Sequence, residues 1–183
     1  MDPDEAVIVA LGGNIAGDFG SSEALLEAAL ACFAQAGLPV VRRSSWWSSA
    51  AWPDPTANEY RNGVVLVEAR MGPLATIRTL FSIEHAFGRS RAEKNAPRTL
   101  DLDLIAHGRV VLETAELILP HPRAHERLFV MGPLAEIAPH WRHPVLGETA
   151  QALAAKASVG RDARPASDKS GHGDRQGPGR GHG

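Results

Sequence analysis

The alternating stretch Leu100-Asp101-Leu102-Asp103-Leu104 constrains the fold of this chain more than any other part of its sequence. Successive side chains of a β-strand point to opposite faces, so the three leucines face a core while the two aspartates lie side by side on the other face. The rise of a strand places their Cα atoms about 7 Å apart. Their carboxylate oxygens can therefore converge on a hard cation such as Mg²⁺.

Basic residues come directly before this acidic pair. Arg89, Arg91, Lys94 and Arg98 all lie in the segment that leads into the strand. Carboxylates hold Mg²⁺, and guanidinium groups hold the phosphate oxygens that the metal does not neutralise. An ordinary charged strand facing solvent is the competing interpretation, but its acids and bases would interleave instead of following one another. The order of charges favours a site for a metal-bound polyphosphate.

Composition sets limits on the class of protein. The chain has 183 residues, 44% of them hydrophobic, and a net charge of −2. This suits one globular domain and gives no electrostatic reason to expect binding to nucleic acid or membranes. A single cysteine, Cys32, excludes an internal disulfide. The sequence shows no signal-like start and no 18-residue apolar run, so we expect a cytoplasmic protein, and a monomer.

The order of the predicted elements indicates the fold class. Hydrophobic patterning predicts strands over 7–11, 40–47, 64–69 and 100–105, and helices over 23–36 and 74–87. This βαββαβ order is typical of a ferredoxin-like α+β sandwich, an antiparallel sheet with helices packed on one face. The glycine-rich stretch 12–18 is predicted to be a turn, and weaker helices are predicted near 128–138 and up to about residue 157.

The C-terminal part of the chain has a different composition. From Val159 onward it is rich in glycine and charge and almost lacks large apolar residues. Such a segment cannot bury enough surface to offset its conformational entropy. We therefore expect a folded domain over residues 1–158 and a disordered tail over 159–183.

Three stretches resemble one enzyme family. Residues 94–105, KNAPRTLDLDLI, resemble the signature of the 6-hydroxymethyl-7,8-dihydropterin pyrophosphokinases of folate biosynthesis. The arrangement Pro120-His121, then Arg127 and Phe129, resembles a second family motif, and Tyr60 and Asn62 match a third. The resemblance covers roughly residues 7–155 and implies the same ferredoxin-like fold. It also implies transfer of the β,γ-diphosphate of ATP to the hydroxymethyl group of the pterin, with AMP as the other product.

The resemblance also implies roles for the charged residues. Two Mg²⁺ ions are expected on Asp101 and Asp103, and the residues implied in catalysis are Arg89, Arg91, Asp101 and Asp103. The residues implied in ATP binding are Glu84, Arg89, Arg91, Arg98, His121 and Arg127.

A pterin site is implied as well, formed by Ser49, Ala51, Trp52, Tyr60, Asn62 and Phe129. The chemistry is consistent with these residue types, because a flat heterocycle stacks on aromatic rings. Its amide and amino edge pairs with a carboxamide, which offers a donor and an acceptor together.

Other functions stay open at this point. Another two-metal nucleotide-dependent transferase could use the same acidic pair, and a non-catalytic ferredoxin-like module could bind nucleotides or RNA. The latter would show stacking aromatic residues on the central strands and a broad basic face. A degenerate, inactive relative is a third alternative, because Gly13 and Asn95 stand where family members often carry serine and tryptophan.

Overall fold

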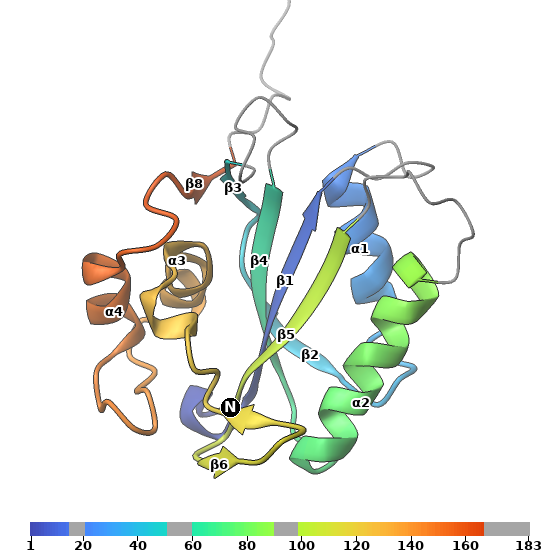
Figure 1. Ribbon diagram of the computed structural model, residues 1–183, viewed down its shortest axis with the longest axis horizontal. Helices are drawn as coiled ribbons and strands as arrows, with labels where there is room; N and C mark the ends of the chain where they lie inside the picture. The colour runs from blue at the N-terminus through green and yellow to red at the C-terminus, as the bar shows by residue number, and fades with distance from the viewer. Residues whose placement is uncertain (15–20, 51–59, 90–98, 167–183) are drawn as a thin grey trace, which may run out of the picture.

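The computed structural model describes residues 1–14, 21–50, 60–89 and 99–166. Its centre is an antiparallel sheet of six strands (Figure 1). The strands are β1 (Val7–Asn14), β2 (Val40–Arg43), β3 (Trp47–Ser49), β4 (Tyr60–Val67), β5 (Thr99–His107) and β8 (Arg164–Pro165). They are ordered β5-β1-β4-β3-β8, and β2 also pairs with β4. The first four positions reproduce the order expected of a βαββαβ core.

Helices α1 (Ser22–Ala31) and α2 (Pro73–Glu84) cover one face of the sheet, which we call the α1/α2 face (Figure 1). Ser21 starts α1 by accepting a hydrogen bond from the backbone amide of Ala24 at 3.0 Å, as an N-cap serine does. Pro73 stands in the first turn of α2, where a missing amide hydrogen costs nothing. A π-helical segment, His85–Arg89, extends α2 beyond the predicted end at Gly88.

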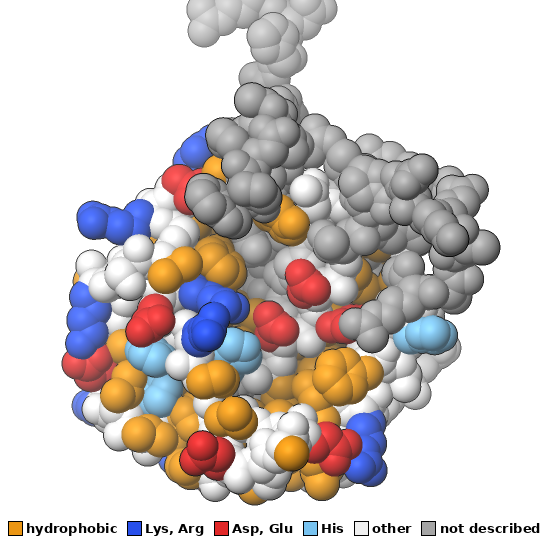
Figure 2. Space-filling model, in the orientation of Figure 1, with side chains coloured by type: hydrophobic (Ala, Val, Ile, Leu, Met, Phe, Trp, Pro, Cys, Tyr) orange, Lys and Arg blue, Asp and Glu red, His pale blue; other side chains and the backbone are white. Residues whose placement is uncertain are grey.

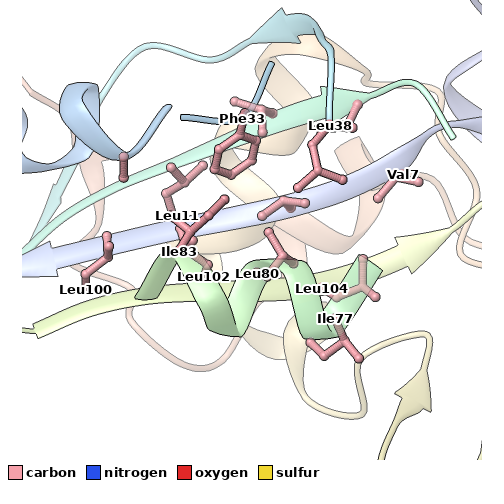
Figure 3. Close-up of a cluster of buried hydrophobic side chains, with 14 of the residues drawn as sticks. Val7, Leu11, Phe33, Leu38, Ile77, Leu80, Ile83, Leu100, Leu102 and Leu104 are labelled. Carbon is pink, nitrogen blue, oxygen red and sulfur yellow. The ribbon is translucent and has the colours of Figure 1, made fainter. Parts of the chain in front are cut away.

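The hydrophobic core under the α1/α2 face uses the leucines of the alternating stretch. Leu100, Leu102 and Leu104 of β5 pack with residues of β1, α1 and α2 (Figure 3). Leu102 and Leu80 are almost fully buried. Burial of one such side chain contributes roughly 1.5–3 kcal/mol. The predicted orientation of the three leucines is therefore confirmed.

A second helical layer covers the opposite face, which the sequence did not predict. Helices α3 (Leu128–Ile137) and α4 (Ala150–Lys156) pack on what we call the α3 face, where Ile8, Val64 and Ile105 lie under Met131. The expectation of helices on one face only is therefore incomplete: the continuous apolar runs of β1 and β4 leave hydrophobic side chains on both faces, and each face needs a cover. Between β5 and α3 lie β6 (Leu112–Glu113), β7 (Ile118–Leu119) and the 3₁₀ turn η4 (Ala124–Glu126).

Three predicted boundaries differ from the structure. The turn expected from Gly12 is strand as far as Asn14, because β4 and β5 pair with both sides of β1 there. The strand expected over 40–47 is divided into β2 and β3, and β4 begins at Tyr60 instead of residue 64.

Order also extends beyond Val159, so the predicted start of the disordered tail is wrong for residues 159–166. These residues bond to the turn before α3 and pair with β3. Residues 167–183 lie outside the described part of the chain.

Within the described ranges no helix is long and apolar enough to cross a lipid bilayer.

Candidate active site

The two aspartates of β5 lie on the α3 face of the sheet. Asp101 is exposed and Asp103 is half-buried, and Ile105, which follows on the same side of the strand, is buried under α3. The pair therefore lies where the apolar cover by α3 ends. This is the arrangement that the alternating sequence predicted.

A row of residues runs across the sheet from Asp101. In the strand register Asp101 pairs with Gly12, Gly12 with Asn62, and Asn62 with Trp47. Directly opposed residues of neighbouring strands share a face, so all four positions face α3. Two strand spacings place the backbones of Asp101 and Asn62 about 10 Å apart. A bicyclic ring with a one-carbon arm can bridge such a span.

Gly12 keeps the centre of this row open. A Cβ atom built on Gly12 would lie 3.5 Å from Oδ1 of Asn62, so any side chain there would stand between Asn62 and Asp101. Sequence reasoning missed this role because it treated Gly12 as part of a turn. An isolated glycine inside a strand was the available signal, since it often marks a close approach by a ligand.

Asn62 is held in one orientation by β3. Its Nδ2 donates to Oγ of Ser49 at 2.8 Å, and both side chains are buried. This bond directs Oδ1 toward Gly12. The carboxamide therefore offers an acceptor, and its second N–H, to a polar heterocycle lying over the row. Tyr60, two residues before Asn62, pairs with Ser49 and faces the same side.

Helix α3 is fixed against the other end of the row. The ring of Trp47 lies so close to Gly132 that a Cβ atom there would approach its Cη2 to 2.6 Å. Glu136 accepts hydrogen bonds from Nε1 of Trp47 at 2.8 Å and from the amide and hydroxyl of Ser45. Partial burial acts to raise the pKa of Glu136, but these bonds outweigh it and lower that pKa.

The start of α3 brings a cation close to the acidic pair. Arg127 precedes the helix, and its guanidinium carbon lies 5.8 Å from the ring centre of Phe129. Burial raises the pKa of Asp103, while the positive charge of Arg127 opposes that rise. Figure 2 shows basic and histidine side chains beside acidic ones on one side of the molecule. Asp103, Arg127 and Phe129 are thus neighbours although 24 residues or more separate the first from the others.

His121 lies beside β5, because its amide donates to the carbonyl of Ile105 at 2.8 Å. Burial lowers the pKa of His121, and the charges of Arg127, Arg123 and His125 lower it further. Its Nδ1 accepts from the amide of Arg123 at 3.2 Å, so the neutral ring carries its proton on Nε2. His121 can therefore donate a hydrogen bond to a phosphate oxygen without being charged.

Glu84 contacts the outer edge of β5. Its Oε1 accepts from the amide of Leu102 at 2.7 Å, and Leu102 stands between the two aspartates. Among the described strands β5 lies at the edge of the sheet, and the carboxylate binds this amide on its outer side. The carboxylate therefore holds the backbone that carries Asp101 and Asp103.

The structure brings together most of the predicted site residues that it describes. The residues that lie on or beside the α3 face are Ser49, Tyr60, Asn62, Asp101, Asp103, His121, Arg127 and Phe129. Glu84 reaches the site through the β5 backbone. Four predicted residues lie outside the described part of the chain, namely Ala51, Trp52, Arg91 and Arg98. For Arg89 only the backbone, at the end of the π-helical segment, is described.

The donor set is consistent with a hard divalent cation. Two carboxylates stand on one face, and burial raises the pKa of one of them, Asp103, although the charge of Arg127 opposes that rise. Within residues 1–14, 21–50, 60–89 and 99–166 no three His, Cys, Asp or Glu side chains converge into a metal site. Asp101 and Asp103 would offer carboxylate oxygens to such a cation, and Mg²⁺ commonly completes its coordination with phosphate and water.

Comparison with known proteins decides the family. The family model described as 7,8-dihydro-6-hydroxymethylpterin-pyrophosphokinase (HPPK) matches residues 8–139. The chain belongs to the HPPK family. The resemblance drawn from residues 94–105 and 120–129 is therefore confirmed, and so is the class of enzyme that it implied.

Curated relatives agree with this assignment. A 2-amino-4-hydroxy-6-hydroxymethyldihydropteridine pyrophosphokinase of Synechocystis is 46% identical over 143 residues, which are 78% of this chain and 71% of the relative. Proteins of the same name from Bacillus subtilis and Methylorubrum extorquens are 38% and 35% identical, and the matches cover 75% and 89% of their lengths.

Solved structures confirm the fold. The Plasmodium falciparum HPPK-DHPS structure with pteroate superposes with a TM-score of 0.63 at 11% identity over 82% of this chain. The match covers 42% of that longer chain. The ferredoxin-like HPPK fold expected from the element order is therefore confirmed.

Proposed function

We propose that the row between Asp101 and Asn62 is the site where this chain transfers the diphosphate of ATP to 6-hydroxymethyl-7,8-dihydropterin. This is the reaction for which its family and relatives are named. The observation that supports the site most strongly is the strand register, which places an acidic pair and a fixed carboxamide on one face with only Gly12 between them.

Asn62, Tyr60 and Phe129 position the pterin in this proposal. The Ser49 hydroxyl fixes the carboxamide of Asn62, which then pairs with the polar edge of the heterocycle. The rings of Tyr60 and Phe129 supply the aromatic faces against which the bicycle stacks. The hydroxymethyl group then points along the row toward Asp101. Ala51 and Trp52 are proposed to complete this site from the segment that follows Ala50.

Arg127 and His121 hold the triphosphate of ATP. The guanidinium group offers a fork of donors for phosphate oxygens, and Nε2–H of His121 adds a neutral donor. Arg89, Arg91 and Arg98 are proposed to neutralise the charge that remains. The attacking hydroxyl forms a bond to the β-phosphorus, the bond from that phosphorus to the oxygen shared with the α-phosphate breaks, and AMP leaves.

Asp101 and Asp103 are proposed to hold Mg²⁺, with two ions expected. A bound divalent cation would supply charge neutralisation at the phosphates and acidify the substrate hydroxyl. The protein positions the two carboxylates through the β5 backbone, which Glu84 binds at the amide of Leu102. We further propose a monomer working in the cytoplasm.

The test is a product assay on isosteric variants. The wild-type protein with ATP, Mg²⁺ and the pterin should release AMP and no ADP, in a pterin-dependent manner. Asp101→Asn and Asp103→Asn remove one charge each and should lower kcat about 10²- to 10⁴-fold. Glu113→Gln, on the exposed strand β6, is the matched control and should retain full activity.

The outcomes separate the reaction from the residue assignment. ADP as the product would contradict diphosphate transfer. AMP from the wild type together with unchanged kcat in both aspartate variants would leave the reaction in place and remove these residues from the site.

A further inference from the structure

The C-terminal segment, residues 158–166, lies against the start of α3. The amides of Ser158 and Val159 donate to the carbonyl of Glu126 at 3.1 and 2.9 Å, and the amide of Leu128 donates to the carbonyl of Val159 at 2.9 Å. Arg127 forms a parallel β-bridge with Val159. These backbone bonds lie on both sides of Arg127, and Phe129 directly follows the last of them.

The same segment then reaches β3, on the side of the proposed pterin site that is formed by Ser49. Strand β8 pairs with β3, with Arg164 opposite Ser48 and Pro165 opposite Trp47. The amide of Ala166 donates to the carbonyl of Trp46 at 2.9 Å. Residues 158–166 therefore connect α3 with β3, the two elements that contribute Phe129 and Ser49.

Gly160 determines where the ring of Phe129 can lie. A Cβ atom on Gly160 would approach Cδ1 of Phe129 to 2.5 Å and Cε1 to 3.0 Å. Gly160 also has a φ of 69°, a conformation that residues with a side chain rarely adopt. The ring of Phe129 therefore packs directly against the backbone of Gly160.

Asp162 binds the end of β3. Its Oδ2 accepts a hydrogen bond from the amide of Ala50 at 2.6 Å. Ala50 directly follows Ser49, whose hydroxyl orients Asn62. The carboxylate therefore fixes the point at which the chain leaves β3.

We propose that residues 158–166 position the pterin, with Gly160 seating Phe129 and Asp162 anchoring β3 at Ala50. These are positioning residues, since the substrate itself would touch Phe129 and Asn62. The segment lies beyond residue 139, where the match to the family model ends. The inference rests on the proposed pterin site.

The first experiment compares two glycines in the full-length protein. Gly160→Ala should raise the KM for the pterin about tenfold and the KM for ATP clearly less, because the ring of Phe129 would contact the pterin, whereas Arg127 only lies beside that ring. Gly147→Ala is the matched control: its φ is 70°, yet nothing lies within 4 Å of its Cβ position. It introduces the same backbone strain without the clash, so it should lose some thermal stability but keep the wild-type KM for the pterin.

A double-mutant cycle tests whether Gly160 acts through the ring. Phe129→Ala should raise the pterin KM by itself. Adding Gly160→Ala to that variant should cause no further rise, because the atom that the new methyl group strikes is gone. At β3, Asp162→Ala should raise the pterin KM because the amide of Ala50 loses its acceptor. Asp162→Asn keeps an acceptor oxygen and should have a pterin KM close to that of the wild type.

The outcomes are distinct. If Phe129→Ala raises the pterin KM while Gly160→Ala and Asp162→Ala do not, residues 158–166 have no positioning role and the proposed site stands. Equal rises in the KM values of both substrates would mark general loss of structure and overturn the inference. A wild-type pterin KM in Phe129→Ala would overturn the pterin site and this inference with it.

Discussion

Gly12 and Glu84 are proposed to shape the site without taking part in its chemistry. Gly12 leaves space between Asp101 and Asn62, and Glu84 binds the β5 backbone between the two aspartates. Neither role can be recognised from the sequence alone, because each depends on which residues lie beside Gly12 and Glu84 in the fold. Each can be tested by a change that preserves the fold.

Gly12→Ala should lower activity without unfolding the protein. The new methyl group would lie 3.5 Å from Oδ1 of Asn62, an ordinary contact, but it would occupy the row over which the pterin is proposed to lie. We expect kcat/KM for the pterin to fall about tenfold or more. Gly72→Ala, whose Cβ position has nothing within 4 Å, is the control and should retain wild-type kinetics. Wild-type kinetics in Gly12→Ala would show that no ligand crosses the row.

Glu84→Ala should lower kcat, because the Leu102 amide loses its acceptor and the edge strand between the aspartates is released. Loss of one such hydrogen bond costs about 0.5–1.5 kcal/mol of stability, which a thermal unfolding curve can register. Glu84→Gln keeps an oxygen acceptor and should retain most of kcat. If the glutamine variant fails as badly as the alanine variant, the negative charge matters, which would favour the direct role near ATP that the family resemblance implied.

At the scale of elements, the position of α3 decides the site. The helix carries Phe129 and follows Arg127, and it is fixed to β3 by Trp47, Gly132 and Glu136. Its sequence, LFVMGPLAEI, was predicted to be a helical segment, and it is one. The face of the sheet on which it lies was not predictable, because a mostly apolar helix has no polar side to orient it.

Glu136→Ala should loosen α3. The substitution removes the acceptor of bonds from the Ser45 amide, the Ser45 hydroxyl and the Trp47 indole. Because Glu136 is itself exposed, we expect a loss of about 1–2 kcal/mol in the free energy of unfolding, measured by denaturant titration. Glu113→Ala on β6 is the control and should change that free energy by less than about 0.5 kcal/mol. An unchanged midpoint in Glu136→Ala would mean that packing of Trp47 alone holds the helix.

At the scale of the whole molecule, we expect a buried histidine outside the proposed site to affect stability. His143 lies between α3 and α4, with its ring beside His125 and Trp141. Its Nδ1 accepts from the amides of Val145 and Leu146, so it is neutral in the folded protein. Burial, together with the charges of His125 and Arg109, lowers the pKa of His143 to about 4, and Glu148 acts in the opposite direction.

The fold should therefore lose stability in acid. The unfolded chain binds a proton at His143 near pH 6.5 and the folded chain only near pH 4, so stability is full above pH 6.5 and falls as pH drops toward 4. We expect His143 to account for about 1–2 kcal/mol of that fall after screening by solvent. His143→Asn keeps an acceptor near Nδ1 but cannot titrate, so its unfolding free energy should vary less between pH 7 and 4.5. Parallel pH profiles for both proteins would contradict this role.

The sequence alone determined the acidic strand, the order of the βαββαβ core and the family. Each depends on neighbours in the chain: alternation places Leu102 and Asp103 on opposite faces whatever the rest of the fold does. It failed at the C-terminal segment, where the composition of residues 159–166 predicted disorder. Those residues are ordered by backbone bonds to Glu126 and Trp46, which composition cannot reveal.

Only the tertiary structure decided which side chains meet. The row from Asp101 through Gly12 to Asn62 depends on the register of three strands, and register is set by pairing between residues far apart in the chain. Likewise Arg127 acts on Asp103 only because α3 packs against the face that the aspartates share. Local pattern fixes the direction in which a side chain points, whereas long-range packing fixes what it faces.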